Sequence, residues 1–486
     1  MQHNKVGEVK LFKQLGHFSL ALILCISTLN AGSFEDFKRS QSESFTKFQD
    51  ERDNTFNTYL QEQFKAYSAH SEMPLYEKPK PKNITPAMQK QTKPVGPKIS
   101  IKIAEVIKPT PIDKPVEVKE AEQKKDINFD FYGSNIGFNI PHKIKQANFY
   151  PQNQKGISNF FSSAASSEYS YLIQDIKQVS KSMNLNDWGV YQLVLQISNK
   201  VYKNQDNSRL LSWFIFNKLG YAVKVGLVKK HVVLMHYSKK TIYSTPNYSF
   251  DDKKYYVIAD YAKESTKRLF SYKQDYPGST KPLDLSLKTL PLFASDIDRK
   301  TLKFTQFGNS YSIAYEYNKN LIEFMATYPQ ADYETFFNAP LDSMTYQSIA
   351  SALKKEIDGK KASEAMNFVL SFVQKSFKYE VDNIQFGREK VMFAQETLYY
   401  DKSDCEDRAV LYAYLIKELF HVPVVGVKYK DHMATALYVP MEGDSVKKGR
   451  RKFVIADPTY MNASIGMSMS KYKAIKPESY IVVKSN

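Results

Sequence analysis

An internal repeat constrains this chain more than any other feature of its sequence. The tripeptide Tyr150-Pro151-Gln152 recurs as Tyr328-Pro329-Gln330, 178 residues later. Further along, 211–226 matches 411–426 at a spacing of 200 residues. Spacings that hold within an element and change only between elements indicate a duplicated unit with loop insertions. The sequence therefore predicts two related domains.

Each copy predicts a mixture of strands and helices. Short runs of β-branched and aromatic residues begin each copy and return near its end, and amphipathic helices lie between them. In the second copy these runs cover 424–429, 434–439 and 452–456. They predict an antiparallel sheet packed behind a helix. We expect an α+β protein with one domain at 127–300 and another at 301–486.

Three residues of the second copy have the pattern of a nucleophile, its base and the group that orients the base. Cys405 lies at the predicted start of an apolar helix, where Ser403 and Glu406 form a capping-box pattern. His432 lies on a predicted strand, and Asp457 ends the next one before a proline. A cysteine, a histidine and an aspartate in such elements are the parts of an activated thiol.

The charges near Cys405 act in opposite directions. A helix N-terminus favours a thiolate over a thiol. Three neighbouring carboxylates oppose ionisation, since they raise the pKa of a thiol; they are Asp404, Glu406 and Asp407. We therefore expect a protonated His432 to hold the thiolate as an ion pair. On its strand His432 should share a face with Ala434 and Ala436, which would leave room for the cysteine helix.

The first copy lacks the thiol. Gln205 occupies the place of Cys405 at the spacing of 200 residues. His236 and Asp260 stand where counterparts of the other two residues are expected. Without a thiol this copy cannot form a thioester. We expect a degenerate domain that acts as a scaffold, a substrate-recognition lobe or a lid.

The residues before the two copies predict three further segments. Residues 1–31 combine lysines, an apolar run too short to span a bilayer and small residues for cleavage. This pattern is typical of a secretory signal peptide, and an uncleaved membrane anchor is the alternative. Residues 32–70 carry aromatics every eleven residues, which predicts one stripe on a long charged helix. Residues 71–126 are rich in lysine and proline and predict an extended linker.

Localisation and partners follow from these segments. An exported protein would lie in the periplasm or cell envelope, and removal of Cys25 with the signal would leave Cys405 as its only cysteine. The aromatic stripe within 33–67 would pack on the protein's own body, on a partner helix or on a membrane surface. We expect no metal or organic cofactor and no nucleic acid, because the sequence has no motif for them and export conflicts with a nucleic-acid partner. The net charge of +17 permits an anionic neighbour, but lysines in linkers and on helix faces produce the same total.

At the cysteine the sequence resembles a known family. Ser403-Asp-Cys-Glu-Asp-Arg-Ala409, His432 and Asp457-Pro-Thr459 are similar to the motifs of the transglutaminase-like superfamily. The resemblance covers 344–471 and implies a papain-like core with Cys405, His432 and Asp457 as a catalytic triad. Ser403 stands where the family often has a glycine, and Ala434 and its neighbours where an aromatic often follows the histidine. These two differences from the family leave the triad in place but would change the shape of the pocket that binds the acyl group.

The resemblance implies that Cys405 attacks an amide carbonyl of a protein or peptide substrate and forms a thioester. We expect hydrolysis, as in a protease or amidase, with crosslinking to an amine as the alternative. The backbone N–H of Cys405 and one side chain would bind the oxyanion, and the candidates are Gln395, Tyr399 and Tyr400. Arg388 and Lys390 are candidates for binding a substrate carboxylate. A non-catalytic, two-lobed binding or scaffold protein of the envelope is the competing hypothesis.

Overall fold

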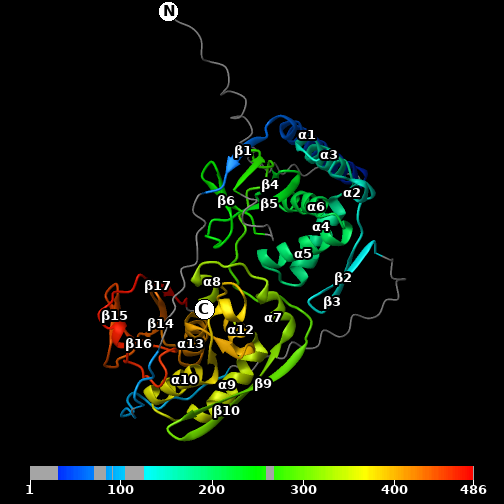
Figure 1. The fold of residues 1–486 in the computed structure, drawn as a ribbon. Coiled ribbons are helices and arrows are strands. Elements are labelled where there is room, and N and C mark those ends of the chain that lie inside the picture. Colours follow the sequence, from blue (N-terminus) through cyan, green and yellow to red (C-terminus); the bar gives the residue numbers. More distant parts are fainter. Residues whose placement is uncertain (1–30, 71–83, 90, 104–124, 259–266, 485–486) are drawn as a thin grey trace, which may run out of the picture. The chain divides into compact units, whose positions relative to one another are not determined.

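Two curled antiparallel sheets with helices packed against them organise the fold (Figure 1). The computed structural model describes residues 31–70, 84–89, 91–103, 125–258 and 267–484. Helices and sheets mix along this part of the chain, which confirms the α+β expectation. The predicted signal peptide lies outside the described residues except for its last residue, Ala31.

The first sheet contains six strands in the order β1-β8-β4-β5-β7-β6, and all neighbouring pairs are antiparallel. Its strands are β1 (Lys65–Ser68), β4 (Val223–Val228), β5 (His231–Tyr237), β6 (Asn247–Phe250), β7 (Lys253–Tyr256) and β8 (Arg268–Ser271). The helix α6 (Gln205–Lys218) leads into β4 and packs on β4 and β5. Asn204 caps this helix, because its side chain accepts a hydrogen bond from the N–H of Asn207 at 3.0 Å.

The second sheet contains five strands in the order β17-β13-β14-β16-β15, again antiparallel throughout. Its strands are β13 (Val424–Tyr429), β14 (His432–Leu437), β15 (Ser445–Lys448), β16 (Arg451–Ala456) and β17 (Ser479–Val482). The helix α13 (Cys405–Phe420) leads into β13 and packs on β13 and β14. Every residue of β14 is buried, because side chains cover both faces of the sheet.

Apart from β1, the two sheets have the same strand order along the chain. Two packed helices precede each sheet: α5 (Asp187–Val201) with α6, and α10 (Ala362–Ser376) with α13. The first residues of α6 and α13, Gln205 and Cys405, stand at the spacing of 200 residues found in the sequence. This shared order is what a repeated unit predicts.

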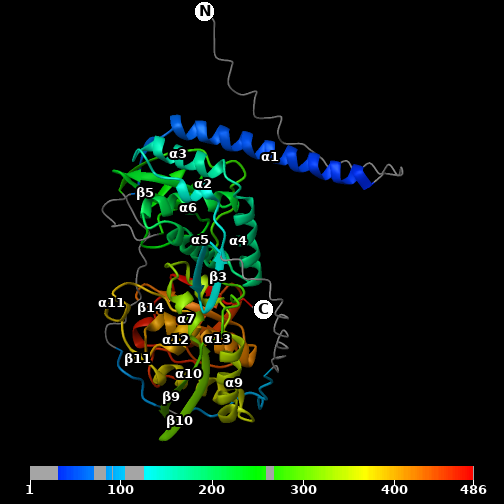
Figure 2. The same ribbon diagram turned by 90° about the vertical axis from the view of Figure 1, so that its right-hand side faces the viewer.

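The remaining elements complete two lobes. The first lobe, from β2 to β8, also holds β2 (Ile127–Phe131), β3 (Ser134–Phe138), α2 (His142–Gln146), α3 (Gln154–Ala165) and α4 (Ser170–Ser182). The second lobe, from β9 to β17, also holds β9 (Ile297–Gln306), β10 (Asn309–Asn318), α7 (Lys319–Ala326), α8 (Tyr333–Phe337), α9 (Ser343–Ile357), β11 (Lys378–Tyr379), α11 (Asp382–Gln385), α12 (Ala394–Tyr399), β12 (Lys402–Ser403) and the 3₁₀ turn η1 (Ser470–Tyr472). The hairpin of β9 and β10 lies along α9 and α10 (Figure 2).

The helix α1 (Ala31–Glu62) belongs to two compact units, one that ends at Arg52 and one that starts at Asp53 and contains both lobes. In the second unit Phe56 is fully buried, as the expected packing on the protein's own body requires. In the first unit Phe37 and Phe48 are 59% and 52% exposed. Neither α1 nor another helix in the described ranges combines the length and the apolar content that a bilayer span needs.

The described part of the predicted linker is bound to the second lobe. Residues 84–89 and 91–103 have almost no regular secondary structure. The N–H of Ala87 donates to the carbonyl oxygen of Met461 at 2.9 Å, and the N–H of Ile99 donates to that of Lys360 at 2.9 Å. These bonds make this stretch an extended strap rather than a free spacer.

Candidate active site at the N-terminus of α13

Cys405 is the first residue of α13, as the sequence predicts. The N-cap is Asp404, whose N–H donates to Oδ2 of Asp407 at 3.2 Å. The capping pair therefore lies one residue later than the predicted Ser403 and Glu406. The prediction was wrong because Ser403 belongs to β12, where its hydroxyl accepts a hydrogen bond from Nε of Arg408 at 3.0 Å.

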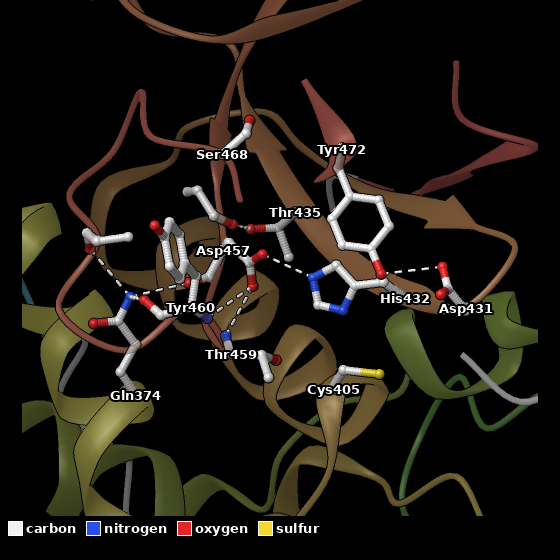
Figure 3. A network of polar contacts seen from close by, with 12 residues as sticks. Gln374, Cys405, Asp431, His432, Thr435, Asp457, Thr459, Tyr460, Ser468 and Tyr472 are labelled. Atoms are coloured by element: carbon white, nitrogen blue, oxygen red, sulfur yellow. Dashed lines mark hydrogen bonds and ion pairs between the residues drawn. The ribbon is translucent and has the colours of Figure 1, made fainter. Parts of the chain in front are cut away.

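His432 and Asp457 form a buried pair. His432 is the first residue of β14, and its Nε2 donates to Oδ2 of Asp457 at 2.7 Å (Figure 3). The other oxygen of Asp457, Oδ1, accepts from the N–H groups of Thr459 at 2.9 Å and Tyr460 at 3.1 Å. These bonds fix the carboxylate, and the carboxylate fixes the tautomer and orientation of the imidazole.

The sulfur of Cys405 lies next to the same histidine. The backbone N–H of Met433, the residue after His432, hydrogen-bonds to the sulfur. Nδ1 of His432 is buried and has no hydrogen-bond partner among the described residues. Figure 3 shows the imidazole between Asp457 and Cys405, with Nδ1 on the side of Cys405. The structure thus brings together the three residues that the sequence predicted.

Two residues that the sequence analysis missed support this group. The ring of Tyr472 stacks on His432 with centroids 4.9 Å apart, and its hydroxyl donates to Oδ1 of Asp431 at 3.0 Å. Gln374 is fully buried in α10, and its Nε2 donates to the carbonyl oxygen of Asp457 at 2.9 Å. Gln374 was visible in the repeat, where it corresponds to Gln196, but nothing in its spacing indicated a partner 83 residues away.

The thiol of Cys405 contacts a carboxylate in the described structure. Sγ of Cys405 lies 3.0 Å from Oε2 of Glu406, and Cys405 is fully buried. Burial, followed by the charges of Glu406 and Asp404, holds the pKa of the Cys405 thiol well above its usual value. The thiol is therefore protonated in this state, and the thiolate–imidazolium pair stays a prediction.

The carboxylates around the thiol are also perturbed. Burial, and next the charge of Asp407, raises the pKa of Glu406 to about 7. Burial, and next the charge of Asp404, raises the pKa of Asp407 well above its usual range. Low solvation disfavours several adjacent charges, so protons on these groups stabilise the folded state.

The same acidic groups are the ones that could hold a cation. Ligand atoms of Asp404, Cys405 and Glu406 lie within 4.8 Å of one another, and so do those of Asp382, Asp404 and Asp407. Carboxylate oxygens suit hard cations such as Mg²⁺ or Ca²⁺. The second group does not stand out in the sequence, because Asp382 comes from the separate helix α11.

The oxyanion candidates make other contacts in the described structure. Oε1 of Gln395 accepts from the N–H of Asp342 at 3.0 Å, and its Nε2 is buried without a partner among the described residues. The rings of Tyr399 and Tyr400 pack on Tyr317 and Phe386, with centroids 5.4 Å and 5.1 Å apart. None of these contacts is with Cys405, and the oxyanion role of the three side chains stays a prediction.

The two substrate-binding candidates differ. Arg388 is exposed, and its NH2 lies 3.4 Å from the carbonyl oxygen of Ala326. Lys390 is buried, and its ammonium pairs with Glu396 at 2.7 Å. In the described structure an ion pair within the chain occupies the charge of Lys390, and its role in binding a substrate carboxylate stays a prediction.

The face of β14 that meets α13 also differs from the expectation. Met433 and Leu437 pack in the main core with Cys405, whereas Ala434 and Ala436 pack on the other face with Tyr472. The alternation along β14 is as predicted. The predicted face was wrong. The helix α13 approaches the large residues of β14, and the small residues lie against the segment that carries Tyr472.

In the first lobe the structural counterpart of His432 is His231 rather than His236. His231 is the first residue of β5, as His432 is of β14, and its Nδ1 lies 3.1 Å from Oδ2 of Asp206. His236 lies near the other end of β5, where burial lowers its pKa to about 3. The sequence match was misleading because both strands contain a histidine at similar spacing. Asp260 lies outside the described residues.

A thiol at a helix N-terminus, next to an imidazole that a carboxylate orients, can attack carbonyl groups. Comparisons of the chain with protein-family models, with curated proteins and with solved structures gave no match. We therefore infer the function from the geometry of this site.

Proposed function

We propose that this protein is a cysteine acyl-transfer enzyme that hydrolyses amide bonds of protein or peptide substrates. One observation carries the proposal. Nε2 of the buried His432 is bound to the buried Asp457 at 2.7 Å, and Nδ1, without a partner in the described chain, lies on the side of Cys405. A histidine that only supported the core would be expected to use both nitrogens or neither.

The side chains then have distinct roles. Cys405 gives its proton to Nδ1 of His432 as the sulfur attacks the substrate carbonyl carbon, so a C–S bond forms and the carbonyl electrons move to oxygen. The imidazolium gives the proton to the leaving amine when the C–N bond breaks, which leaves a thioester. His432 next takes a proton from water as the water oxygen attacks the thioester carbonyl. The C–S bond then breaks, the acyl group leaves as a carboxylic acid, and the imidazolium returns the proton to the sulfur. Asp457 stabilises the imidazolium throughout.

The fold and the sequence motifs also support a grouping of this protein at the level of a superfamily. The order of Cys405, His432 and Asp457 and the helix-before-sheet arrangement are compatible with a transglutaminase-like protein. The first lobe, with the same strand order and with Gln205 in place of the thiol, would be a degenerate copy. If residues 1–31 direct export, the substrates lie in the periplasm or cell envelope, and the alternative of an uncleaved anchor would leave the enzyme at the membrane.

The decisive experiment is product analysis by mass spectrometry. Wild-type protein and Cys405→Ala are each incubated with an envelope extract, and peptides that are cut or joined are identified. We expect cut amide bonds that depend on Cys405. New isopeptide bonds would instead support crosslinking, and the absence of any Cys405-dependent change would overturn the proposal.

One observation favours a non-catalytic binding protein as the second candidate. Cys405 is fully buried, and its thiol is protonated in the described state. Labelling with iodoacetamide near neutral pH separates the two hypotheses. A binding protein would be labelled no faster than a free thiol, and a change of His432 to alanine would not affect the rate. An enzyme would be labelled faster, and the variant would lose that advantage.

A further inference from the structure

Tyr379 lies beside the segment that leads into Cys405. It lies on β11, which pairs in parallel with β12, and Tyr379 is opposite Ser403. The N–H of Lys378 donates to the carbonyl oxygen of Asp401 at 3.0 Å, and the N–H of Glu380 donates to that of Ser403 at 3.3 Å. Backbone bonds on both sides of Tyr379 thus fix it to the chain just before the helix.

The hydroxyl of Tyr379 is buried and has no hydrogen-bond partner within the described ranges. Two other tyrosines of the second lobe show the usual solution: Tyr315 donates to the carbonyl oxygen of Leu398, and Tyr472 to Asp431. The hydroxyl of Tyr412 is also buried without a partner in the described residues, but Tyr412 lies inside α13 and not on a strand that pairs with the segment before Cys405. A buried hydroxyl without a partner destabilises the folded state. Such a group is therefore expected where a ligand or a reacting atom supplies the missing acceptor.

Cys405 is the ionisable neighbour with the largest effect on the pKa of this hydroxyl. Burial is the largest cause that raises the pKa of Tyr379, and the charge of Cys405 comes next, ahead of Asp404. The guanidinium carbon of Arg408 lies 5.6 Å from the ring centroid. The hydroxyl therefore keeps its proton at all ordinary pH values and can act as a neutral donor towards the sulfur side of the site.

We propose that Tyr379 is a catalytic residue whose hydroxyl donates a hydrogen bond to the oxyanion that forms when Cys405 attacks a carbonyl. The backbone N–H of Cys405, in the first turn of α13, would be the second donor. Tyr379 keeps its own proton in this step, in which the Cys405 proton moves to His432: the carbonyl electrons move to oxygen as the C–S bond forms and return when the amine leaves. This inference rests on the proposed function and replaces Gln395, Tyr399 and Tyr400 in the role expected for them.

The test compares two reactions of the same sulfur. Acylation by p-nitrophenyl acetate passes through an oxyanion, whereas alkylation by iodoacetamide is a displacement at a saturated carbon and does not. In Tyr379→Phe we expect acylation of Cys405 to be slower by about 100-fold, the usual effect of removing one such donor, while alkylation stays within about two-fold of wild type. Tyr400→Phe is the matched control and should leave both rates unchanged, because its ring packs on Phe386.

Each outcome separates the inference from the proposed function. Acylation of Tyr379→Phe at the wild-type rate, with Cys405→Ala unreactive, overturns the role of Tyr379 and leaves the enzyme hypothesis intact. Equal slowing of both reactions also overturns it, because it shows an effect on the thiol rather than on the oxyanion. If the ester does not acylate Cys405 in wild type, both proposals fail.

A second variant tests the proposal if Tyr379→Phe does not fold. Substitution of residue 379 by 3,5-difluorotyrosine keeps the ring and makes the hydroxyl a stronger donor. We expect acylation at least as fast as in wild type, again with unchanged alkylation. A ten-fold loss of acylation in this variant would contradict the proposal, because the donor is still present.

Discussion

Sγ of Cys405 lies 3.0 Å from a carboxylate oxygen of Glu406, the next residue in the chain, although His432 lies beside the same sulfur. The histidine meanwhile keeps Nδ1 without a partner in the described structure. The thiol proton thus has two possible acceptors. Glu406 accepts a hydrogen bond from the protonated thiol, whereas His432 would remove the proton and leave a reactive thiolate. The reactive state requires a change of partner from Glu406 to His432.

Replacement of the first acceptor should make the thiol more reactive. In Glu406→Gln the negative charge that raises the pKa of Cys405 is absent, so more thiolate is present at pH 8. We expect alkylation by iodoacetamide to be several-fold faster than in wild type. Glu364→Gln, which changes a surface carboxylate paired with Lys360, is the control. An unchanged alkylation rate in Glu406→Gln would show that Glu406 does not restrain the thiol.

Replacement of the orienting carboxylate should remove most of the activity. Asp457→Asn keeps the size of the side chain but favours the wrong imidazole tautomer. We expect ester hydrolysis at Cys405 to fall by about 10⁴-fold, the loss known for the equivalent change in a serine-protease triad. The rate of p-nitrophenolate release measures this effect. Asp401→Asn, at a largely exposed carboxylate, is the control and should retain wild-type rates.

The sequence could predict the elements of the site but not all of its partners. The sequence predicted Cys405 at the start of a helix, His432 on a strand and Asp457 at the end of the next strand. Hydrophobic periodicity and turn residues determine such positions locally. The pairing of the thiol with Glu406 depends on side-chain rotation and burial, which periodicity does not describe. The choice between the two faces of β14 depended in the same way on packing from Tyr472, a distant segment.

For the two lobes as well, the sequence predicted the elements but not every side-chain position. Strand order and helix starts agree between the two lobes, and the fixed spacings predicted this agreement. The match of His236 to His432 failed because residue spacing alone does not tell which end of a strand carries a side chain. The composition of 84–89 and 91–103 predicts a linker, whereas backbone hydrogen bonds bind this stretch to the second lobe.

Stability should fall as the pH rises through the neutral range. The pKa of Glu406 is raised to about 7 in the folded protein from its ordinary value of 4.5, so the folded state binds this proton more tightly than the unfolded state. The contribution is fully present below about pH 4.5 and is lost as the pH rises through about 7. We expect a higher midpoint of thermal unfolding at pH 5.5 than at pH 8, and a smaller difference in Glu406→Gln.

This measurement needs a chelator, because the same carboxylates are those that could hold a cation. EDTA removes metal ions, so that only protons bind to these carboxylates. The difference between the pH dependence of wild type and that of Glu406→Gln then reports the proton on Glu406. Equal pH dependence in wild type and Glu406→Gln would contradict the prediction.

Gln374 couples the helix core to the position of the orienting carboxylate. Its Nε2 donates to the carbonyl oxygens of Asp457 at 2.9 Å, Tyr460 at 2.8 Å and Ala463 at 3.1 Å. In Gln374→Ala these buried carbonyls lose their donor, which should lower the free energy of unfolding by about 2–3 kcal/mol. The loop that carries Asp457 also loses its anchor, so ester hydrolysis should fall by at least ten-fold under conditions in which the variant is folded.

The control for this prediction is Gln152→Ala, at an exposed glutamine of the first lobe. It should change the free energy of unfolding by less than about 0.5 kcal/mol, because surface substitutions away from special contacts have small effects. Urea unfolding and the ester assay measure the two quantities separately. A variant Gln374→Ala that is destabilised but fully active would show that Asp457 is positioned by Thr459 and Tyr460 alone, since their N–H groups bind its carboxylate directly.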